Sequence, residues 1–146
     1  MVRAATPRDA PGLLRLIAAL GVDPARLGES EQTAFNTNLL RALSTPGCTV
    51  LVADSGGRIL GAITIWSRTG LFNTGPTGLL DHLVVDPDLA ESAIAAALIE
   101  QGIGACQALG CHEVQAIPAS HDSSQRALLA RFGFEEAGVG LTLRVL

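Results

Sequence analysis

Hydrophobic positions near the start of the chain recur at the spacing of a helix. The segment Thr6–Asp9 has the features of a helix start, with Thr as the N-cap, Pro at the first helical position and an acid three residues after the cap. The helix is predicted to run to about residue 20, where Gly21 ends it. A short strand at 2–5 precedes it, and a second helix is predicted over about residues 30–43. The apolar positions that define the first helix are Leu13, Leu14, Ile17 and Leu20.

From residue 48 the pattern changes to short runs of apolar and β-branched residues, which favour strands. Residues 48–54 and 58–66 are two such runs, and Ser55-Gly56-Gly57 between them is typical of a hairpin turn. A loop rich in Gly, Pro and Asn follows at 69–78, and residues 78–85 form a third run. The three runs predict an antiparallel meander.

The remaining pattern predicts a helix at 88–109, a strand at 112–117, a capped helix at 122–132 and a final strand at 138–146. No internal repeat or linker divides the chain, so residues 1–146 are expected to form a single domain. The predicted order is β-α-α-β-β-β-α-β-α-β. This order indicates an α/β protein of the α+β type, with helices on both faces of a central mixed sheet.

Composition narrows the class of protein. Hydrophobic residues make up 48% of the chain and charged residues 16%, which favours a large buried interior or a subunit interface and leaves a homodimer open. The net charge is −4, the strong bases are all arginines and no basic run is present, so nucleic acid is not an expected partner. No apolar run is long enough to span a bilayer, and the amino terminus lacks the apolar core of a signal peptide. We therefore expect a cytoplasmic protein with no membrane partner.

The cysteines are Cys48, Cys106 and Cys111, and they form no CxxC pair. An odd number of cysteines without metal-ligand spacing argues against a disulfide framework and against a structural zinc site. We expect three buried thiols, with a reactive cysteine as the alternative. The three histidines and scattered acids also lack the spacing of metal ligands, so no metal is expected.

The order of elements and three local stretches resemble the GNAT superfamily of acyl-CoA-dependent N-acyltransferases. The stretches are VRAATPRDAPGLLRL at 2–16, LLDHLVVDPDL at 79–89, which leads into a helix, and SSQRALLARFGFEEAG at 123–138. The resemblance covers nearly the whole chain. It implies the GNAT fold, acetyl-CoA as cosubstrate, and an amine of a small molecule or peptide as acceptor.

In that family, backbone groups of a splayed strand hold the thioester carbonyl and the pantetheine arm of the cofactor. By resemblance this role falls on Leu83, Val84 and Val85, for which a plain buried strand is the alternative. Asp122 stands where the family tends to place an Asn that contacts the cofactor arm. The alternative for Asp122 is a helix cap, because Asp122-Ser123-Ser124-Gln125 also reads as a capping box.

The family binds the pyrophosphate at the amino terminus of the next helix, where unpaired N–H groups favour anions. Its usual pattern is Arg or Gln, two residues, Gly, any residue, then Gly or Ala. The segment that aligns with this pattern is Ala90, Glu91, Ser92, Ala93, Ile94 and Ala95, of which only Ala95 is a common substitute. Asp88 and Glu91 also read as a capping box whose carboxylates would compete with a phosphate. The glycines at 102 and 104 are expected to lie inside the helix. Either they allow a close contact between this helix and a neighbouring element, or the helix simply tolerates them.

By the same resemblance Asp81 is the catalytic base, since it aligns with the acid that many members use to take a proton from the amine, directly or through water. His82 is the second catalytic candidate, and the alternation of side chains along a strand predicts that it points to the face opposite Asp81. The family often supplies an acid from a tyrosine, but the matching residue is Leu129 and the chain has no Tyr. Solvent would then protonate the departing thiolate.

Three further residues are weaker candidates for the site. His121 follows the fifth predicted strand, near the end of the sheet where clefts form, and a solvated loop histidine is its alternative. Trp66, Phe72 and the loop at 69–78 flank the meander and could line a substrate pocket, with a core position as the alternative for Trp66.

Two functions follow from these patterns. The first is an N-acetyltransferase that transfers an acetyl group from acetyl-CoA to a primary amine, with Asp81 as base. The second is a GNAT-like module that has lost catalysis and acetyl-CoA binding and serves in binding or dimerisation. The missing glycines, Arg and Tyr motivate the second function.

Overall fold

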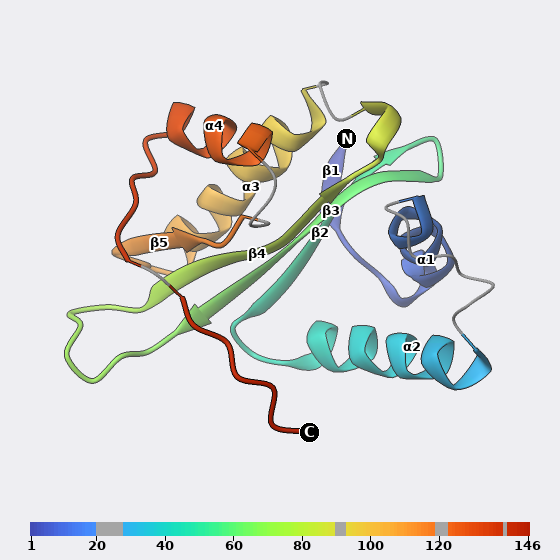
Figure 1. Ribbon diagram of the computed structural model, residues 1–146, viewed down its shortest axis with the longest axis horizontal. Coiled ribbons are helices and arrows are strands. Elements are labelled where there is room, and N and C mark those ends of the chain that lie inside the picture. Colours follow the sequence, from blue (N-terminus) through green and yellow to red (C-terminus); the bar gives the residue numbers. More distant parts are fainter. Residues whose placement is uncertain (20–27, 90–92, 119–122, 139) are drawn as a thin grey trace.

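The computed structural model describes residues 1–19, 28–89, 93–118, 123–138 and 140–146. In this part of the chain, one mixed sheet has the strand order β1-β2-β3-β4-β5 (Figure 1). The first four strands pair in an antiparallel manner, and β4 and β5 pair in parallel. The strands are β1 Val2–Ala4, β2 Cys48–Ser55, β3 Arg58–Arg68, β4 Thr77–Val85 and β5 Glu113–Ala116.

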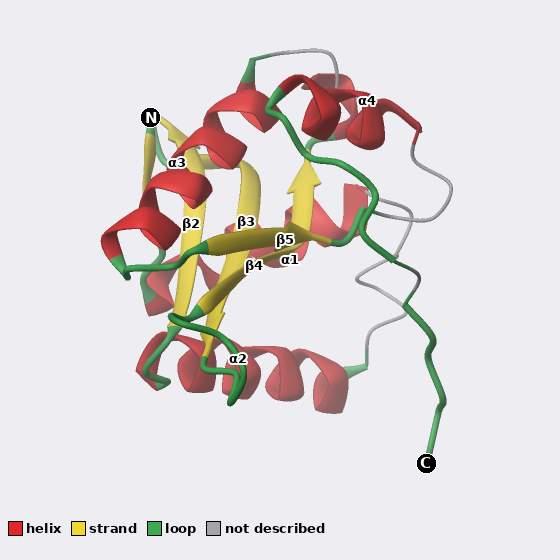
Figure 2. Ribbon diagram, turned by 90° about the vertical axis from the view of Figure 1, so that its left-hand side faces the viewer, coloured by secondary structure: helices red, strands yellow, loops and turns green. Residues whose placement is uncertain are grey.

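Helices cover both faces of the sheet, as predicted (Figures 1 and 2). One core lies between the sheet and the first two helices and includes Leu16, Leu39 and Val52. The other lies between the sheet and the last two helices and includes Ile65 and Leu98. The α-helices are α1 Ala10–Ala19, α2 Glu29–Ser44, α3 Ile94–Ala108 and α4 Ser123–Arg131. Among the described residues, none of these helices is long and apolar enough to cross a lipid bilayer.

Local sequence signals account for much of this order. The Thr6 N–H donates to Asp9 Oδ2 at 2.8 Å, so the predicted helix start is confirmed, although a short 3₁₀ turn, η1 (Pro7–Asp9), precedes α1. The predicted end of this helix, at residues 20 and 21, lies outside the described residues. The predicted hairpin is also confirmed: Gly56 and Gly57 have φ of +58° and +91°, which suits the tight turns that match strand twist.

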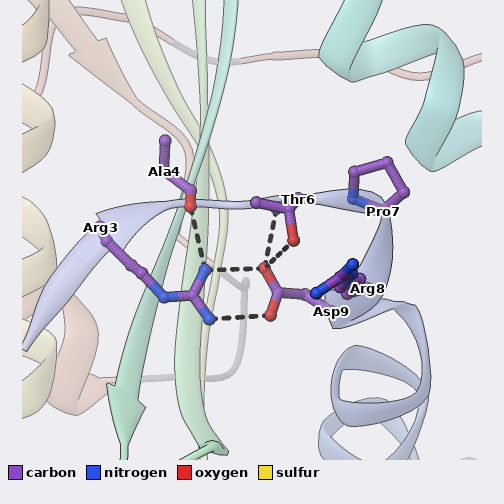
Figure 3. Close-up of a pocket in the computed structure, with 6 residues that line it drawn as sticks. All are labelled: Arg3, Ala4, Thr6, Pro7, Arg8 and Asp9. Carbon is purple, nitrogen blue, oxygen red and sulfur yellow. Dashed lines mark hydrogen bonds and ion pairs between the residues drawn. The ribbon is translucent and has the colours of Figure 1, made fainter.

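Arg3 of β1 binds two carboxylates that lie on different elements. Its guanidinium donates to both oxygens of Asp9, at 2.8 and 2.9 Å (Figure 3), and to Asp54 Oδ2 at 3.0 and 3.1 Å. Asp54 Oδ1 in turn accepts the N–H of Gly57 at 2.8 Å. These hydrogen bonds from Arg3 hold the pKa of the buried Asp9 carboxyl below its ordinary value. The network ties β1, the start of the first helix and the β2–β3 hairpin together.

The predicted final strand at 138–146 is wrong. Residues 140–146 are neither helix nor strand, and they run away from the body of the molecule (Figures 1 and 2). A strand requires a hydrogen-bonded neighbour as well as a suitable side-chain pattern. The sheet described here ends at β5, so the tail adds no strand to it. Its side chains at Leu141, Leu143 and Val145 are 94%, 83% and 79% exposed.

The two glycines inside α3 have different surroundings. A Cβ at Gly102 would lie 3.0 Å from Leu80 Cδ2 and 3.5 Å from Ile63 Cδ1, so this glycine allows a close contact between α3 and the sheet. A Cβ at Gly104 would meet no atom within 4 Å. Gly102 therefore allows a close contact between α3 and the sheet, as one of the two alternatives predicted. Gly104 allows no such contact, and the helix simply tolerates a glycine there.

Gly104→Ala is expected to raise the free energy of unfolding by about 0.5–1 kcal/mol, because alanine restricts the unfolded chain and favours the helix. Gly102→Ala is expected to gain less or to lose stability, because Leu80 must move. Urea unfolding of the two variants measures the difference. Equal stabilisation by both substitutions would contradict the close contact at Gly102.

Candidate active site

Strand β4 separates from β5 halfway along its length (Figure 1). The paired residues run from Thr77 with Glu113 to Leu80 with Ala116, and the Ile117 N–H reaches the Leu80 carbonyl at 3.4 Å. Beyond that point β4 continues to Val85, while β5 has ended. In the described part of the chain, residues 81–85 therefore lie along an edge that β5 does not cover.

A β-bulge lies where the two strands separate. Thr64 of β3 faces Asp81 and Ala62 faces Val84, so one residue of β3 spans two residues of β4. His82 has φ of +49°, in the left-handed region that non-glycine residues rarely occupy. The extra residue changes which side chains share a face: Leu80 and Leu83 are three positions apart, yet both pack in the core beneath α3.

The bulge also brings the two catalytic candidates together. His82 Nδ1 lies 3.1 Å from Asp81 Oδ2. The Asp81 side chain is 25% exposed and the His82 side chain 78% exposed, so both can be reached from solvent. The prediction that they point to opposite faces is wrong, because alternation holds only in a regular strand and the bulge at His82 interrupts it.

Gln125 of α4 connects to the free part of β4. Its Nε2 donates to the Leu83 carbonyl at 3.0 Å, and this bond crosses the region where β4 and β5 diverge. The sequence suggested Gln125 only as part of a capping box with Asp122, which lies outside the described residues. No local signal indicated the bond, since the two residues are 42 positions apart.

Asp86 forms the junction between β4 and the following helix. Its Oδ1 accepts the N–H of Asp88 at 3.0 Å, and its carbonyl accepts the N–H of Leu89 at 2.8 Å. Its Oδ2 also accepts Arg58 Nη2 at 3.1 Å. Asp86 thus caps a 3₁₀ turn, η2 (Pro87–Leu89), which such i to i+3 bonds favour. The prediction of a helix from residue 88 is wrong, because α3 begins at Ile94.

The start of α3 carries no acidic residue in its first turn, and Ala93 makes no side-chain cap hydrogen bond there. The Ile94 side chain packs in the core and Ala95 is buried, so this segment would meet an anion through its main chain. A Cβ on Gly61 of β3 would lie 2.9 Å from Leu98 Cδ1 and 3.2 Å from Ile94 Cγ2. The absence of a side chain at Gly61 therefore lets the first turns of α3 pack closely on the sheet.

The structure locates only some of the other candidates. Leu129 is buried in the core beneath α3, so it does not replace the family's tyrosine at an open site. Trp66 is half-buried, and Phe72 is 98% exposed in the β3–β4 connection. Four residues proposed to bind cofactor and one loop histidine lie outside the described residues. These are Ala90, Glu91, Ser92, Asp122 and His121.

Two surface hollows lie away from Asp81 and His82. The larger, of about 570 Å³, is lined by residues 3, 4 and 6–9 around the Arg3–Asp9 pair (Figure 3). The smaller, of about 310 Å³, lies between α1 and the β4 junction, and Arg15, Arg58 and Asp86 line part of it. In the larger hollow Arg3, Thr6 and Asp9 already bind one another, so we assign no chemistry to it.

The sequence matches the model of the acetyltransferase (GNAT) family over residues 16–134. The match includes the bulge, the separation of β4 from β5, and α3. The chain therefore belongs to the GNAT family of acetyltransferases. No curated protein matches the sequence.

Solved structures confirm the fold. A transcriptional regulator from Bacillus halodurans C-125 is similar with a TM-score of 0.89 at 16% identity, over 99% of this chain and 98% of that one. A putative acetyltransferase from Agrobacterium tumefaciens str. C58 has a TM-score of 0.82 at 23% identity, over 99% of both chains. Glucosamine-6-phosphate N-acetyltransferase from Arabidopsis thaliana has a TM-score of 0.81 at 17% identity, over 99% of this chain and 97% of that one. These identities show a shared fold and leave the substrate open.

The left-handed backbone at His82 gives a stability prediction. His82→Gly is expected to change the free energy of unfolding by less than about 1 kcal/mol, because glycine accepts a positive φ. His82→Val is expected to lower it by about 1–3 kcal/mol, because a β-branched side chain is strained there. Urea unfolding of both variants tests this. An equal loss in both variants would show that the positive φ at residue 82 does not determine how a substitution there changes the free energy of unfolding.

Proposed function

We propose that this protein is an N-acetyltransferase that transfers an acetyl group from acetyl-CoA to a primary amine of a small molecule or peptide. Members of the GNAT family generally use acetyl-CoA. The observation that carries the proposal is the bulge at His82. It places the Asp81 carboxylate where β4 loses its β5 partner, beside a length of main chain that β5 leaves uncovered.

Asp81 acts as the base. An amine is protonated near neutral pH and must lose a proton before it can attack a carbonyl carbon. The Asp81 carboxylate takes this proton, directly or through a water molecule. His82 Nδ1 lies 3.1 Å from Asp81 Oδ2. When Nδ1 carries a proton, in the Nδ1–H tautomer or in the imidazolium form, it donates a hydrogen bond that orients the Asp81 carboxylate.

The main chain of Leu83, Val84 and Val85 holds the thioester end of the cosubstrate. Bound acetyl-CoA would supply an activated acyl carbon and a thiol leaving group. N–H groups along the uncovered part of β4 are suited to bind the carbonyl oxygen and the pantetheine amides, since backbone donors need no particular side chain. Gln125 fixes the Leu83 carbonyl and thereby holds this stretch of β4 in place.

The phosphates bind at the start of α3. The helix dipole at the start of α3 favours an anion near Ala93, Ile94 and Ala95, and the first turn of α3 contains no carboxylate. The carboxylates that would compete with a phosphate are those of Asp88 and Glu91, which precede the helix. Ala90, Glu91, Ser92 and Asp122 complete the proposed cofactor site on the strength of the family alignment. The departing thiolate takes its proton from solvent, because the chain has no Tyr and Leu129 is buried.

Asp81→Asn is expected to lower kcat about 100-fold or more, because the amide cannot take the proton from the amine. The affinity for acetyl-CoA is expected to stay unchanged. Steady-state kinetics over a panel of amines, with calorimetric titration of acetyl-CoA, measures both quantities. Glu100→Gln, which removes an exposed carboxylate on α3, is the matched control and should retain full activity.

Two results would defeat the proposal. Asp81→Asn with unchanged turnover would remove Asp81 from the role of base. Failure of the wild-type protein to bind acetyl-CoA at millimolar concentration, with no acyl transfer to any amine, would favour the non-catalytic binding module.

We also propose that residues 1–146 form one cytoplasmic domain that assembles as a homodimer. The family match spans most of the chain, and the three cysteines are free thiols, which suits a reducing compartment. Leu141, Leu143 and Val145 alternate with other residues in the exposed tail, and β5 is an edge strand of the sheet that the described residues form. Pairing of this tail with β5 of a second copy would cover both the apolar side chains and the sheet edge.

The combined substitution of Leu141, Leu143 and Val145 by Ser is expected to convert a dimer into a monomer, because it removes the apolar face of the tail. Light scattering during size exclusion measures the mass of each form. Arg144→Gln, in the same tail, should leave the dimer intact. A wild-type protein that is monomeric at concentrations around 100 µM would refute the homodimer.

A further inference from the structure

Two cysteines meet where α3 ends and the chain turns back towards β5. The Cys111 N–H donates to the Cys106 carbonyl at 3.0 Å, and the Gly110 N–H donates to the Gln107 carbonyl at 3.0 Å. Gly110 has φ of +77°. This pair of bonds is a Schellman motif, in which the first and sixth residues commonly pack against each other. Here those two residues are both cysteines.

The two thiols are neighbours. Both sulfur atoms border the same space beside Gly78, and Cys111 Sγ also lies 3.9 Å from Ser67 Oγ. The backbone hydrogen bond of 3.0 Å holds the main chains of the two cysteines next to each other, and a disulfide requires such a short separation of its Cα atoms.

Gly78 of β4 provides the space for both sulfur atoms. A Cβ at residue 78 would collide with Cys106 Sγ and would lie 3.4 Å from Cys111 Sγ. The thiol pair is thus enclosed by the first half of β4, the end of α3 and the start of β5. This is the closed end of the β4–β5 pair, away from the bulge at His82.

The two sulfur atoms differ in their exposure. Cys106 is fully buried, and burial together with the neighbouring Cys111 thiol raises the pKa of Cys106 to about 11. Cys111 is half-buried, so part of this residue is exposed to solvent. The third cysteine, Cys48, packs with the core on the opposite face of the sheet and lies outside this pair.

We propose that Cys106 and Cys111 form a site of reversible oxidation, at which a peroxide converts the two thiols into a disulfide. The Cys111 thiolate attacks one peroxide oxygen, the O–O bond breaks, and the second oxygen leaves and is protonated to water. Cys106 sulfur then bonds to Cys111 sulfur as the S–O bond of the sulfenic acid breaks, and the hydroxyl leaves with the Cys106 proton as water. The thiols lose two electrons and the peroxide gains them. A thiol or dithiol reductant restores both cysteines.

The bond would fasten the end of α3 to the start of β5, the strand that pairs with the first half of β4. In a cytoplasmic protein such a disulfide is transient and reports oxidising conditions. The site rests on two neighbouring thiols and is independent of the proposed acetyltransferase activity.

The test is a count of free thiols in the full-length protein after exposure to hydrogen peroxide. The protein is unfolded, its thiols are alkylated with iodoacetamide, and the product is weighed by intact-mass spectrometry. We expect the reduced wild type to carry three alkyl groups and the oxidised protein one, on Cys48, with the loss of two hydrogen atoms. Dithiothreitol should return all three sites. A peptide digest under non-reducing conditions should contain the Cys106–Cys111 link.

Single substitutions of the cysteines show which two of the three thiols form the bond. Cys48→Ser should form the bond as the wild type does, whereas Cys111→Ser should leave Cys106 reduced, because Cys106 is buried. The proposal is overturned if oxidised wild type still carries three alkyl groups. It is also overturned if Cys111 gains oxygen atoms while Cys106 remains free, or if Cys48 takes part in the link.

Discussion

The β-bulge at His82 is the constraint on which the candidate site depends. A regular strand would keep β4 in register with β3 and would send neighbouring side chains to opposite faces. The extra residue lets Leu80 and Leu83 share the core beneath α3, and it places Asp81 and His82 in contact. It lies where β4 parts from β5, so the carboxylate stands beside a main chain that β5 leaves uncovered. Leu80 and Leu83 pack in the core beneath α3, and this packing fixes the chain on either side of the strained backbone at residue 82.

Elements on both sides of the bulge hold this arrangement. Gln125 binds the Leu83 carbonyl from α4, and Asp86 closes the turn at the end of β4. Gly61 and Gly102 let α3 lie close to the sheet over the free part of β4 and over Leu80. At the other end of β4, Gly78 makes room for the Cys106 and Cys111 thiols. The same strand therefore carries an open end suited to a ligand and a closed end suited to a thiol pair.

Much of the fold could be predicted from the sequence, because helix caps and turns depend on residues that are close together in the chain. The Thr6–Asp9 start and the Gly56-Gly57 turn each act over a few residues, and the structure has both. The candidate carboxylate at Asp81 was also identifiable, by resemblance to the family. The errors lie elsewhere. The helix predicted from residue 88 begins at Ile94, because Asp86 caps a separate 3₁₀ turn, and the predicted last strand finds no partner in the described sheet.

The sequence by itself determined most of the segments that become helices and strands, because capping residues, turn glycines and hydrophobic periodicity act within a few positions of the chain. Only the tertiary structure decided the orientation of Asp81 and His82, the bond from Gln125 to Leu83 and the meeting of Cys106 with Cys111 beside Gly78. These arrangements depend on the register of β4 against β3, on the end of β5 and on how closely α3 packs against the sheet. Register and packing are set by contacts between residues far apart in the chain, which a local pattern does not encode.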